Sequence, residues 1–391
     1  MTTIAPALPF LASDRAQRRR NTGVLPYQQI KNMIREREIV ALQDIEPDQL
    51  QPASLDLRLG NIAYRVRASF LPGAGSTVEK KITQLDAYSV SLSEGAVLER
   101  GCVYVIPLLE TLALRNGITA FANPKSSTGR LDILTRLITD QGTSFDLVEK
   151  GYSGPLYVEV APRTFSVLVR AGDRLNQIRF RRGTGQVARS QIDELRANSL
   201  RDDGGPSTQP FREQLVGVTI DLKGIDTDNL VGWRAKRHTD KIDLRRIGYY
   251  DPFDFWEPIY SHREASLILD PDAFYILATR EAVRVPPDYA AEMVAYDTNV
   301  GEFRVHYAGF FDPGFGWGDG AEDSRAVLEV RSHEVPFVLE HGQTIGWLRY
   351  EYMAGTPDRI YGSALKSNYQ GQRLALAKQF AEPRRQGRSP S

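Results

Sequence analysis

The chain has 391 residues, and its 49 Lys and Arg residues balance its 49 Asp and Glu residues. This length accommodates two or three domains, each able to bury a hydrophobic core. The balanced charge argues against DNA, RNA or an anionic membrane as the main partner and favours a small charged metabolite. Because Cys102 is the only cysteine, an intramolecular disulfide and a zinc site built on paired thiolates are excluded.

The N-terminal part, residues 1–45, is predicted to form a leader and one short helix. Ile30, Met33 and Ile34 recur at helical spacing after Pro26, which indicates a helix over residues 27–37. No stretch approaches the roughly 18 apolar residues that cross a bilayer, and the start has no charged-then-apolar export signal. We therefore expect a cytoplasmic protein that does not act on a membrane.

From residue 46 onward the sequence consists of short β-rich runs. Leu55, Leu57 and Leu59 alternate with polar residues, which predicts a strand with one polar face. Further runs at residues 103–106, 156–160 and 177–180 are separated by Gly and Pro. Short strands at this spacing indicate an all-β sandwich or barrel, and not a parallel sheet with crossover helices.

The first half of this pattern recurs in order in the second half. The block at Ser54 returns at Thr219, an offset of 165 residues, and the block at Ala171 returns at His341, an offset of 170. Two blocks between them, at residues 103–106 and 158–160, also return. Four blocks in register indicate a tandem duplication of one all-β domain. The predicted domains are a first repeat over 46–184, a linker over 185–209 with a candidate helix near residues 192–200, a second repeat over 210–356 and a closing tail over 357–391.

Two features of the repeats point to chemistry. Residues 125–130 (Lys-Ser-Ser-Thr-Gly-Arg) combine one Lys, three hydroxyls, one Gly and one Arg, a dense set of donors for phosphate oxygens. The alternative interpretation of this run is a solvent-exposed turn without a ligand. Glu159 and Glu329 each lie among apolar neighbours in a predicted strand. The alternative interpretation is that each is an ordinary residue on the solvent-facing side of its strand. Phosphate donors together with a carboxylate in an apolar strand favour nucleotide chemistry.

In order and spacing, the motifs resemble the dCTP deaminase branch of the trimeric dUTPase-fold superfamily over most of residues 25–375. They are Gln-Pro-Ala-Ser-Leu-Asp-Leu-Arg-Leu-Gly at 51–60, Lys-Ser-Ser-x-x-Arg at 125–130, Gly-Tyr-Ser-Gly at 151–154, Asp-Pro-Gly at 312–314 and Tyr361 with Tyr-Gln-Gly-Gln at 369–372. The resemblance implies a tandem pair of distorted β-barrel or jelly-roll domains with short peripheral helices, and sites formed between repeats or subunits. It also implies a magnesium-bound triphosphate and hydrolytic deamination at cytosine C4 without zinc. One repeat per chain is commoner in that family, so the double repeat is a departure.

The two repeats depart from the family pattern in complementary ways. The first keeps the phosphate segment 125–130 but has a lengthened run, 131–150, before the Gly turn. The second replaces the phosphate segment with the acidic run 296–302 but keeps the base-binding loop at 305–314. This predicts that the first repeat supplies the phosphate contacts while the second supplies the base contacts and the catalytic acid.

The resemblance and this division imply individual roles. Glu329 is the expected acid and base, with its pKa raised by partial burial, Glu159 is the alternative, and Ser126 stabilises charge developing at the ring. The expected substrate-binding residues are Lys125, Ser126, Ser127 and Arg130 for the phosphates, His306 and Asp312 for the base and sugar loop, and Tyr361, Lys366 and Gln372 for the closing tail. His306 is equally explained as a structural histidine. Asp56 and Asp221, which recur at one place in both repeats, suggest a shared structural hydrogen bond.

Three functional classes remain open from the sequence. The first is a dCTP deaminase that makes dUTP and ammonia in pyrimidine deoxynucleotide metabolism. The second is a dUTP diphosphatase or a bifunctional enzyme that makes dUMP. Against this class, Glu149 occupies the position where a water-activating Asp is expected. The third is a nucleotide-binding regulator without catalysis. We expect a homo-oligomer, and a trimer of six repeats would suit shared sites, although a closed dimer or a monomer is also compatible.

Overall fold

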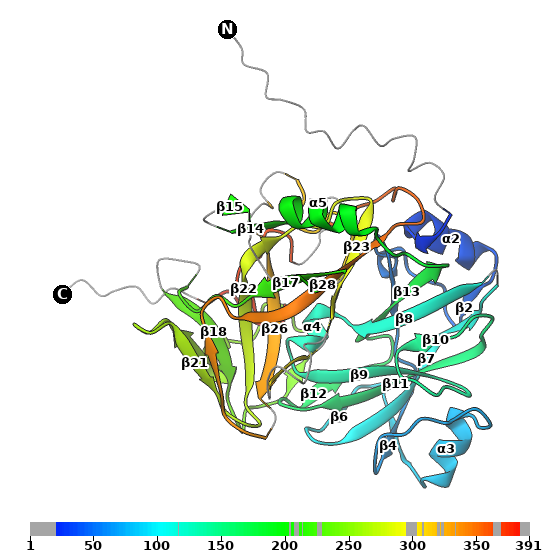
Figure 1. Ribbon diagram of the computed structural model, residues 1–391. Coiled ribbons are helices and arrows are strands. Elements are labelled where there is room, and N and C mark those ends of the chain that lie inside the picture. The colour runs from blue at the N-terminus through cyan, green and yellow to red at the C-terminus, as the bar shows by residue number, and fades with distance from the viewer. Residues whose placement is uncertain are drawn as a thin grey trace.

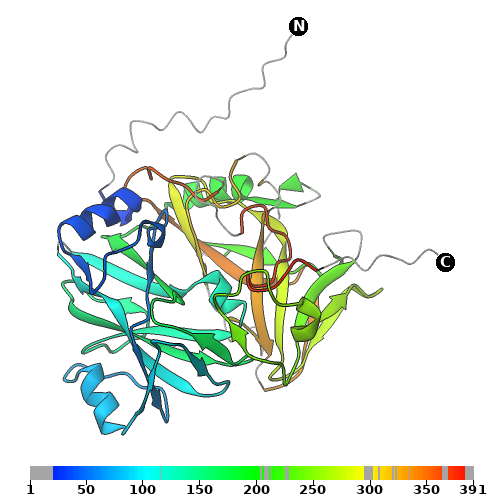
Figure 2. The ribbon, with the colours of Figure 1, turned by 180° about the vertical axis from the view of Figure 1, so that it is seen from behind.

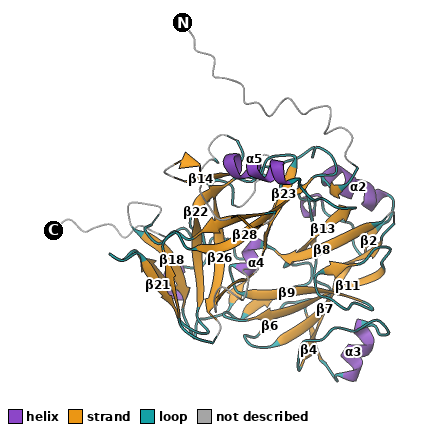
Figure 3. Ribbon diagram, in the orientation of Figure 1, coloured by secondary structure: helices purple, strands orange, loops and turns teal. Residues whose placement is uncertain are grey.

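The computed structural model describes residues 21–115, 117–202, 205–206, 211–212, 214–224, 229–294, 303–306, 309–318, 321, 324–332, 334–362 and 369–383. Within them two β-rich bodies lie side by side, with a few short helices at their edges (Figure 1, Figure 3). The predicted all-β fold with two barrels in tandem is confirmed. None of the helices described is long and apolar enough to span a bilayer.

The first barrel is built from three sheets. The largest has the order β5-β4-β7-β11-β9, with β2 also paired to β7. Its strands are β2 (Ile39–Ala41), β4 (Ile62–Val66), β5 (Tyr88–Ser91), β7 (Val103–Ala113), β9 (Ile133–Thr139) and β11 (Ser153–Pro162). The second sheet comprises β1 (Gly23–Val24), β3 (Leu55–Leu57), β8 (Ile118–Pro124), β10 (Leu147–Val148) and β13 (Asn176–Arg182), and the third contains β6 (Ala96–Leu98) and β12 (Val167–Val169).

The second barrel repeats this pairing. Its strands are β14 (Leu200–Asp202), β15 (Gly205–Pro206), β16 (Phe211–Arg212), β17 (Leu215–Thr219), β18 (Leu230–Ala235), β20 (Trp256–Tyr260), β21 (Ser266–Leu269), β22 (Phe274–Val283), β23 (Tyr289–Val294), β24 (Phe303–His306), β25 (Phe310–Phe311), β26 (Arg325–Ser332), β27 (Phe337–Glu340) and β28 (Thr344–Tyr352). The pairing β18-β22-β26-β24 matches β4-β7-β11-β9 of the first barrel, and β17-β28-β23-β25 matches β3-β13-β8-β10. Glu159 on β11 and Glu329 on β26 therefore occupy equivalent positions.

The strand at residues 55–59 differs from its prediction in one respect. The polar face that alternates with Leu55 and Leu57 is also buried, because Asp56 and Arg58 are each only 2% exposed. A buried charge is tolerated only when it is paired. Arg58 Nε accordingly donates to Glu110 at 2.8 Å, and Asp56 forms an ion pair with Lys125.

The helices pack against the barrels. Two of them lie in the N-terminal part and the linker, where helices were predicted. Helix α2 (Tyr27–Arg35) packs Tyr27, Ile30 and Met33 into the first core, so it belongs to the first barrel. It ends two residues before the predicted Arg37, which adopts φ 60°. Helix α5 (Arg189–Ser199) buries Ile192 in the second core, so this part of the predicted linker belongs to the second barrel. The remaining helices are η2 (Pro47–Gln49), α3 (Val78–Gln84), α4 (Ser126–Gly129) and α6 (Pro252–Phe255).

Segments that cross between the barrels fix how the two lie against each other. Strand β19 (Ile242–Asp243), from the second half of the sequence, pairs in parallel with β12 of the first barrel. Phe165 of the first barrel contacts Trp256 of the second, with ring centroids 5.3 Å apart. The tail, residues 369–383, crosses the junction and appears in red in Figure 2, and its Phe380 packs on Trp256. The aromatic group near Trp256 therefore packs between the repeats.

Candidate active site

A cavity of about 300 Å³ lies between the two barrels and is lined by residues of both. The first barrel contributes Lys125, Ser126, Ser127 and Arg130, the second contributes Phe310, Asp312 and Glu329, and the C-terminal region contributes Tyr361, Tyr369, Gln372 and Lys378. The phosphate-type segment of one repeat thus faces the carboxylates of the other within a single chain, as the complementary divergence of the repeats predicts.

The phosphate-type segment is a tight turn at the end of β8. Residue Lys125 is extended, and helix α4 follows it directly, with Thr128 N bonded to Lys125 O at 2.8 Å and Arg130 N to Ser126 O at 3.0 Å. The Lys125 ammonium forms an ion pair with Asp56 on β3. Asp56 therefore lines the cavity as the partner of a site lysine, while its counterpart Asp221 lies 3.5 Å from Arg325. The feature that the repeats share is an acid paired with a cation, and not only a hydrogen bond.

Arg130 connects the cavity to the C-terminal tail. Its side chain is nearly buried, with the residue 2% exposed, and its guanidinium donates to Gln372 Oε1 at 2.7 Å and to Ala375 O at 3.1 Å. The same group stacks on the ring of Tyr369 at 3.9 Å. Gln372 Nε2 in turn donates to Arg325 O, at the start of β26, at 2.9 Å. Arg130 and Gln372 thus hold the tail closed over the junction.

Glu329 lies on β26, between β22 and β24, and lines the cavity with only 7% of the residue exposed. Burial raises the pKa of its carboxyl to about 8, against the opposing positive charge of Arg130. A carboxyl group with such a pKa exchanges a proton near neutral pH, which is what a general acid and base requires. The backbone of His306 on β24 pairs with that of Glu329, and the predicted role of the His306 side chain stays a prediction.

Strand β25 (Phe310–Phe311) and the following Asp312 form part of the second-barrel wall of the cavity. Arg179, on β13 of the first barrel, donates to Asp312 Oδ1 at 3.1 Å and to Phe311 O at 3.3 Å. Burial raises the pKa of Asp312, and the charge of Arg179 opposes that rise. Tyr361 supports the loop from behind, with its backbone N–H bonded to Pro313 O at 2.7 Å, and burial raises the pKa of its phenol.

Glu159 lies elsewhere. It is not among the residues that line the cavity, and its Oε1 accepts from Arg136 Nε at 3.0 Å within the first barrel. Arg136 also stacks on Phe145 at 3.7 Å. The alternative assignment of the acid and base to Glu159 is therefore not supported by its position. Lys366 and the acidic run 296–302 lie outside the described residues.

Several cavity residues were not singled out from the sequence. Gln177 and Arg174 lie in the last of the repeated blocks, whose recurrence could have marked them. Lys378 enters from the tail, where no periodicity or motif marks it. Met293, Val327 and Leu328 supply the apolar part of the wall and read in the sequence as ordinary strand residues.

The paired barrels and the cavity between them define a protein of the dUTPase-like class with two fused repeats. Family models show which branch. The model for the 2'-deoxycytidine 5'-triphosphate deaminase N-terminal domain matches residues 21–184, and the model for the C-terminal domain of the same family matches residues 190–380. The chain belongs to the dCTP deaminase family.

Individual relatives agree with this membership. The crystal structure of 2'-deoxycytidine 5'-triphosphate deaminase from Agrobacterium tumefaciens is 52% identical, with a TM-score of 0.81, over 87% of this chain and 100% of that one. The "dCTP deaminase, dUMP-forming" of Beutenbergia cavernae is 29% identical over 34% of this chain and 62% of that protein. The protein of that name from Halobacterium salinarum is 34% identical over 27% of this chain and 52% of its own length. The matched segments thus span only part of these two relatives.

Proposed function

We propose that the chain deaminates dCTP by hydrolysis in the cavity between its barrels and then releases the nucleotide as dUMP. The observation that carries the proposal is that Lys125, Ser126 and Ser127 line the same cavity as the buried carboxyl of Glu329. Membership of the dCTP deaminase family supports the deamination. The product dUTP expected from the sequence disagrees with the relatives named dUMP-forming, and dUMP replaces it here.

Glu329 moves the proton in the deamination step. Its carboxylate takes a proton from water, the water oxygen bonds to C4 of the cytosine, and the proton passes to the exocyclic nitrogen as the C4–N bond breaks and ammonia leaves. Proton transfer of this kind contributes about 10² to 10⁴ in rate. The Ser126 hydroxyl, which bonds to no other described residue, is available to stabilise the charge that develops at the ring.

The second step is hydrolysis at the α-phosphorus. A carboxylate takes a proton from water, the water oxygen bonds to that phosphorus as the bond to the bridging oxygen breaks, and diphosphate leaves. Magnesium enters as part of the nucleotide substrate. In the first repeat Glu149 stands where the resemblance implies a water-activating Asp. Asp312 of the second repeat lines the cavity instead, and Glu149 is exposed beside β10. The carboxylate of Asp312 is therefore available to accept the proton of the attacking water.

The residues described as lining the cavity come from the two repeats and the tail of one chain. The homo-oligomer predicted from the resemblance stays a prediction, which sedimentation velocity at several protein concentrations would check.

The test is to incubate the purified protein with dCTP and with dUTP, each with magnesium, and to measure ammonia and diphosphate. We expect equal amounts of ammonia and diphosphate from dCTP. Ammonia without diphosphate would make dUTP the product, and diphosphate from dUTP alone would indicate a diphosphatase. Binding of dCTP without either product would contradict catalysis and indicate a regulator.

A further inference from the structure

A second cavity, of about 310 Å³, adjoins the active cavity on the first-barrel side. The two cavities share the residues Asp56, Lys125, Ser127, Arg174 and Lys378. The ion pair between Lys125 and Asp56 stands at this shared wall. The far side of the second cavity is formed by Leu244, Arg245 and Ile247, which follow β19. Lys125 and Ser127, which are expected to bind the substrate phosphates, stand at the shared wall, whereas the residues that line the second cavity alone have no role in the deamination proposed above.

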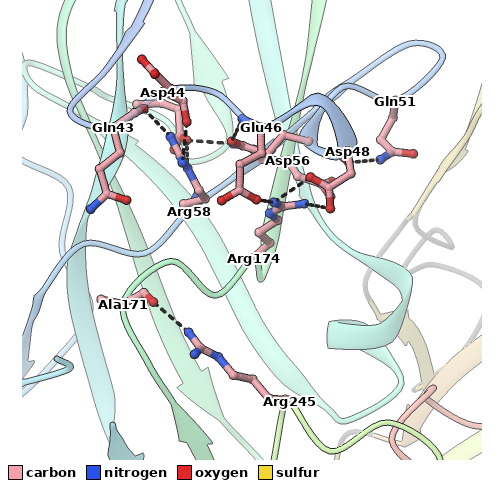
Figure 4. Close-up of polar contacts among 12 residues, drawn as sticks. Gln43, Asp44, Glu46, Asp48, Gln51, Asp56, Arg58, Ala171, Arg174 and Arg245 are labelled. Atoms are coloured by element: carbon pink, nitrogen blue, oxygen red, sulfur yellow. Dashed lines mark hydrogen bonds and ion pairs between the residues drawn. The ribbon is translucent and has the colours of Figure 1, made fainter. Parts of the chain in front are cut away.

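Four cationic side chains line the second cavity against two acidic ones: Lys125, Arg174, Arg245 and Lys378 against Asp56 and Asp173. Arg174 lies 3.0 Å from Asp48, and Arg245 donates to Asp173 at 2.6 Å and to Ala171 O at 2.9 Å. Figure 4 shows Arg174 pointing to the acids of residues 46–48 and Arg245 reaching the Ala171 carbonyl. The acidic partners of Arg174 are largely solvent-exposed, at 57% for Glu46 and 74% for Asp48, so these pairs are weak. The cavity therefore keeps an excess of positive charge.

Lys378 differs from the other three cations. Within the part of the chain that the structure describes, its ammonium makes no hydrogen bond or ion pair, although its side chain lies at the wall of both cavities. Burial lowers the pKa of Lys378, the charge of Lys125 lowers it further, and the carboxylates of Asp56 and Asp173 oppose the shift. Partial burial of an ammonium that is not directly paired is costly, and an anionic ligand in contact with it reduces that cost.

We propose that the second cavity binds inorganic diphosphate, with Lys378 as its main ligand. This inference rests on the proposed function, because diphosphate is the group released when the α-phosphorus is hydrolysed. Diphosphate carries several negative charges in a small volume, which suits a cavity lined by lysine ammonium and arginine guanidinium groups. The shared wall lets the leaving group move from the active cavity past Ser127 and Lys125 into the second cavity, while the nucleoside monophosphate stays behind. Diphosphate held there delays its own release and inhibits the next turnover.

The test is calorimetric titration of the full chain with sodium diphosphate and with orthophosphate. The variant Lys378→Gln should weaken diphosphate binding about tenfold, the loss of one charge-assisted contact. Lys241→Gln is the matched control, since Lys241 is a half-exposed lysine that lines neither cavity, and it should leave diphosphate binding and turnover unchanged. Orthophosphate should bind more weakly than diphosphate in every variant.

Ile247 allows the second cavity to be tested separately from the active one, because it lines the second cavity only and is 57% exposed. Ile247→Glu adds a negative charge that should weaken diphosphate binding about fivefold, whereas the neutral Ile247→Gln should not. Equal diphosphate binding in the wild type, Lys378→Gln and Ile247→Glu would overturn the proposal. Because added diphosphate is titrated directly, this result is distinguishable from failure of the protein to release diphosphate from dCTP, which would contradict the proposed function.

Discussion

Arg179 of the first barrel and Asp312 of the second are bonded across the junction at 3.1 Å, with side chains only 3% and 9% exposed. Arg179 also donates to Ala291 O at 3.1 Å and lies 4.0 Å from the centroid of the Phe310 ring. One side chain of the first barrel thus contacts both β23 and the segment 310–312 of the second barrel. We infer that Arg179 positions the base loop and does not itself touch the substrate.

Replacing Arg179 should impair both stability and substrate binding. Arg179→Met leaves the buried Asp312 carboxylate without its partner, which should lower the free energy of unfolding by about 3 to 5 kcal/mol. The displaced loop should raise the KM for dCTP more than it lowers kcat, because Glu329, the proposed acid and base, is on a different strand. Denaturant unfolding and steady-state ammonia release measure the two effects.

A double variant separates the charge from the geometry. In Arg179→Met with Asp312→Asn, no charge is buried unpaired, so the stability should recover by about 1 to 3 kcal/mol while the KM stays raised. If the double variant is no more stable than Arg179→Met alone, the ion pair is not what Arg179 contributes.

Replacing each of the two strand glutamates by Gln should affect ammonia release differently. Glu329→Gln should reduce ammonia release by at least about 10³-fold and leave dCTP binding in place, because the amide fills the same space but cannot carry the proton. Glu159→Gln, its equivalent in the first barrel, should retain turnover, since it bonds to Arg136 away from the cavity. Full turnover in Glu329→Gln together with its loss in Glu159→Gln would reverse the roles assigned to the two barrels.

The pKa of Glu329 predicts how stability depends on pH. Its pKa is about 8 in the folded chain and lies near 4.3 in an unfolded chain. Between these values the folded state holds a proton that the unfolded state has lost, so this group's contribution to stability is complete below pH 4.3 and is lost as the pH rises to about 8. The slope attributable to one such group is at most about 1.4 kcal/mol per pH unit.

The comparison that checks this pH dependence uses Glu329→Gln, which cannot titrate. Urea unfolding at intervals from pH 5 to pH 8 should show the wild type losing stability relative to the variant as the pH increases. A constant difference between the two proteins across this range would mean that the Glu329 carboxyl is not protonated in the folded state.

The duplication and the strand content follow from the sequence because they depend on local periodicity and on ordered blocks. Val158-Glu159-Val160 and Leu328-Glu329-Val330 have the same pattern, and they occupy the same place in two matching sheets. The burial of Asp56 was not predicted, because alternation identifies the two faces of a strand but not what covers each face. In the structure Lys125 covers Asp56, and the two residues lie 69 positions apart in the chain.

The resemblance predicted that Tyr361 and Gln372 belong to a closing tail, but the path beyond residue 372 could not be predicted. Residues 369–383 have neither helical nor strand periodicity, and the position of the later ones depends on contacts distant in sequence, such as Phe380 with Tyr250. The cavity residue Lys378 is placed by this path alone. The meeting of the 125–130 segment with Glu329 was predicted, because the two repeats have lost complementary motifs.

The tail contacts of Arg130 lead to the last prediction. Arg130→Ala removes a charge that lines the cavity and also the donors to Gln372 and Ala375, so it should raise the KM for dCTP by about 10² and release the tail. Limited proteolysis should then cut residues 369–383 faster than in the wild type. Arg130→Lys keeps the charge but lacks the planar guanidinium and its stacking on Tyr369. Its KM should therefore lie between those of the wild type and Arg130→Ala, while its tail is still cut faster than the wild-type tail. If Arg130→Lys protects the tail as well as the wild type does, charge alone holds the tail and the fork contacts are dispensable.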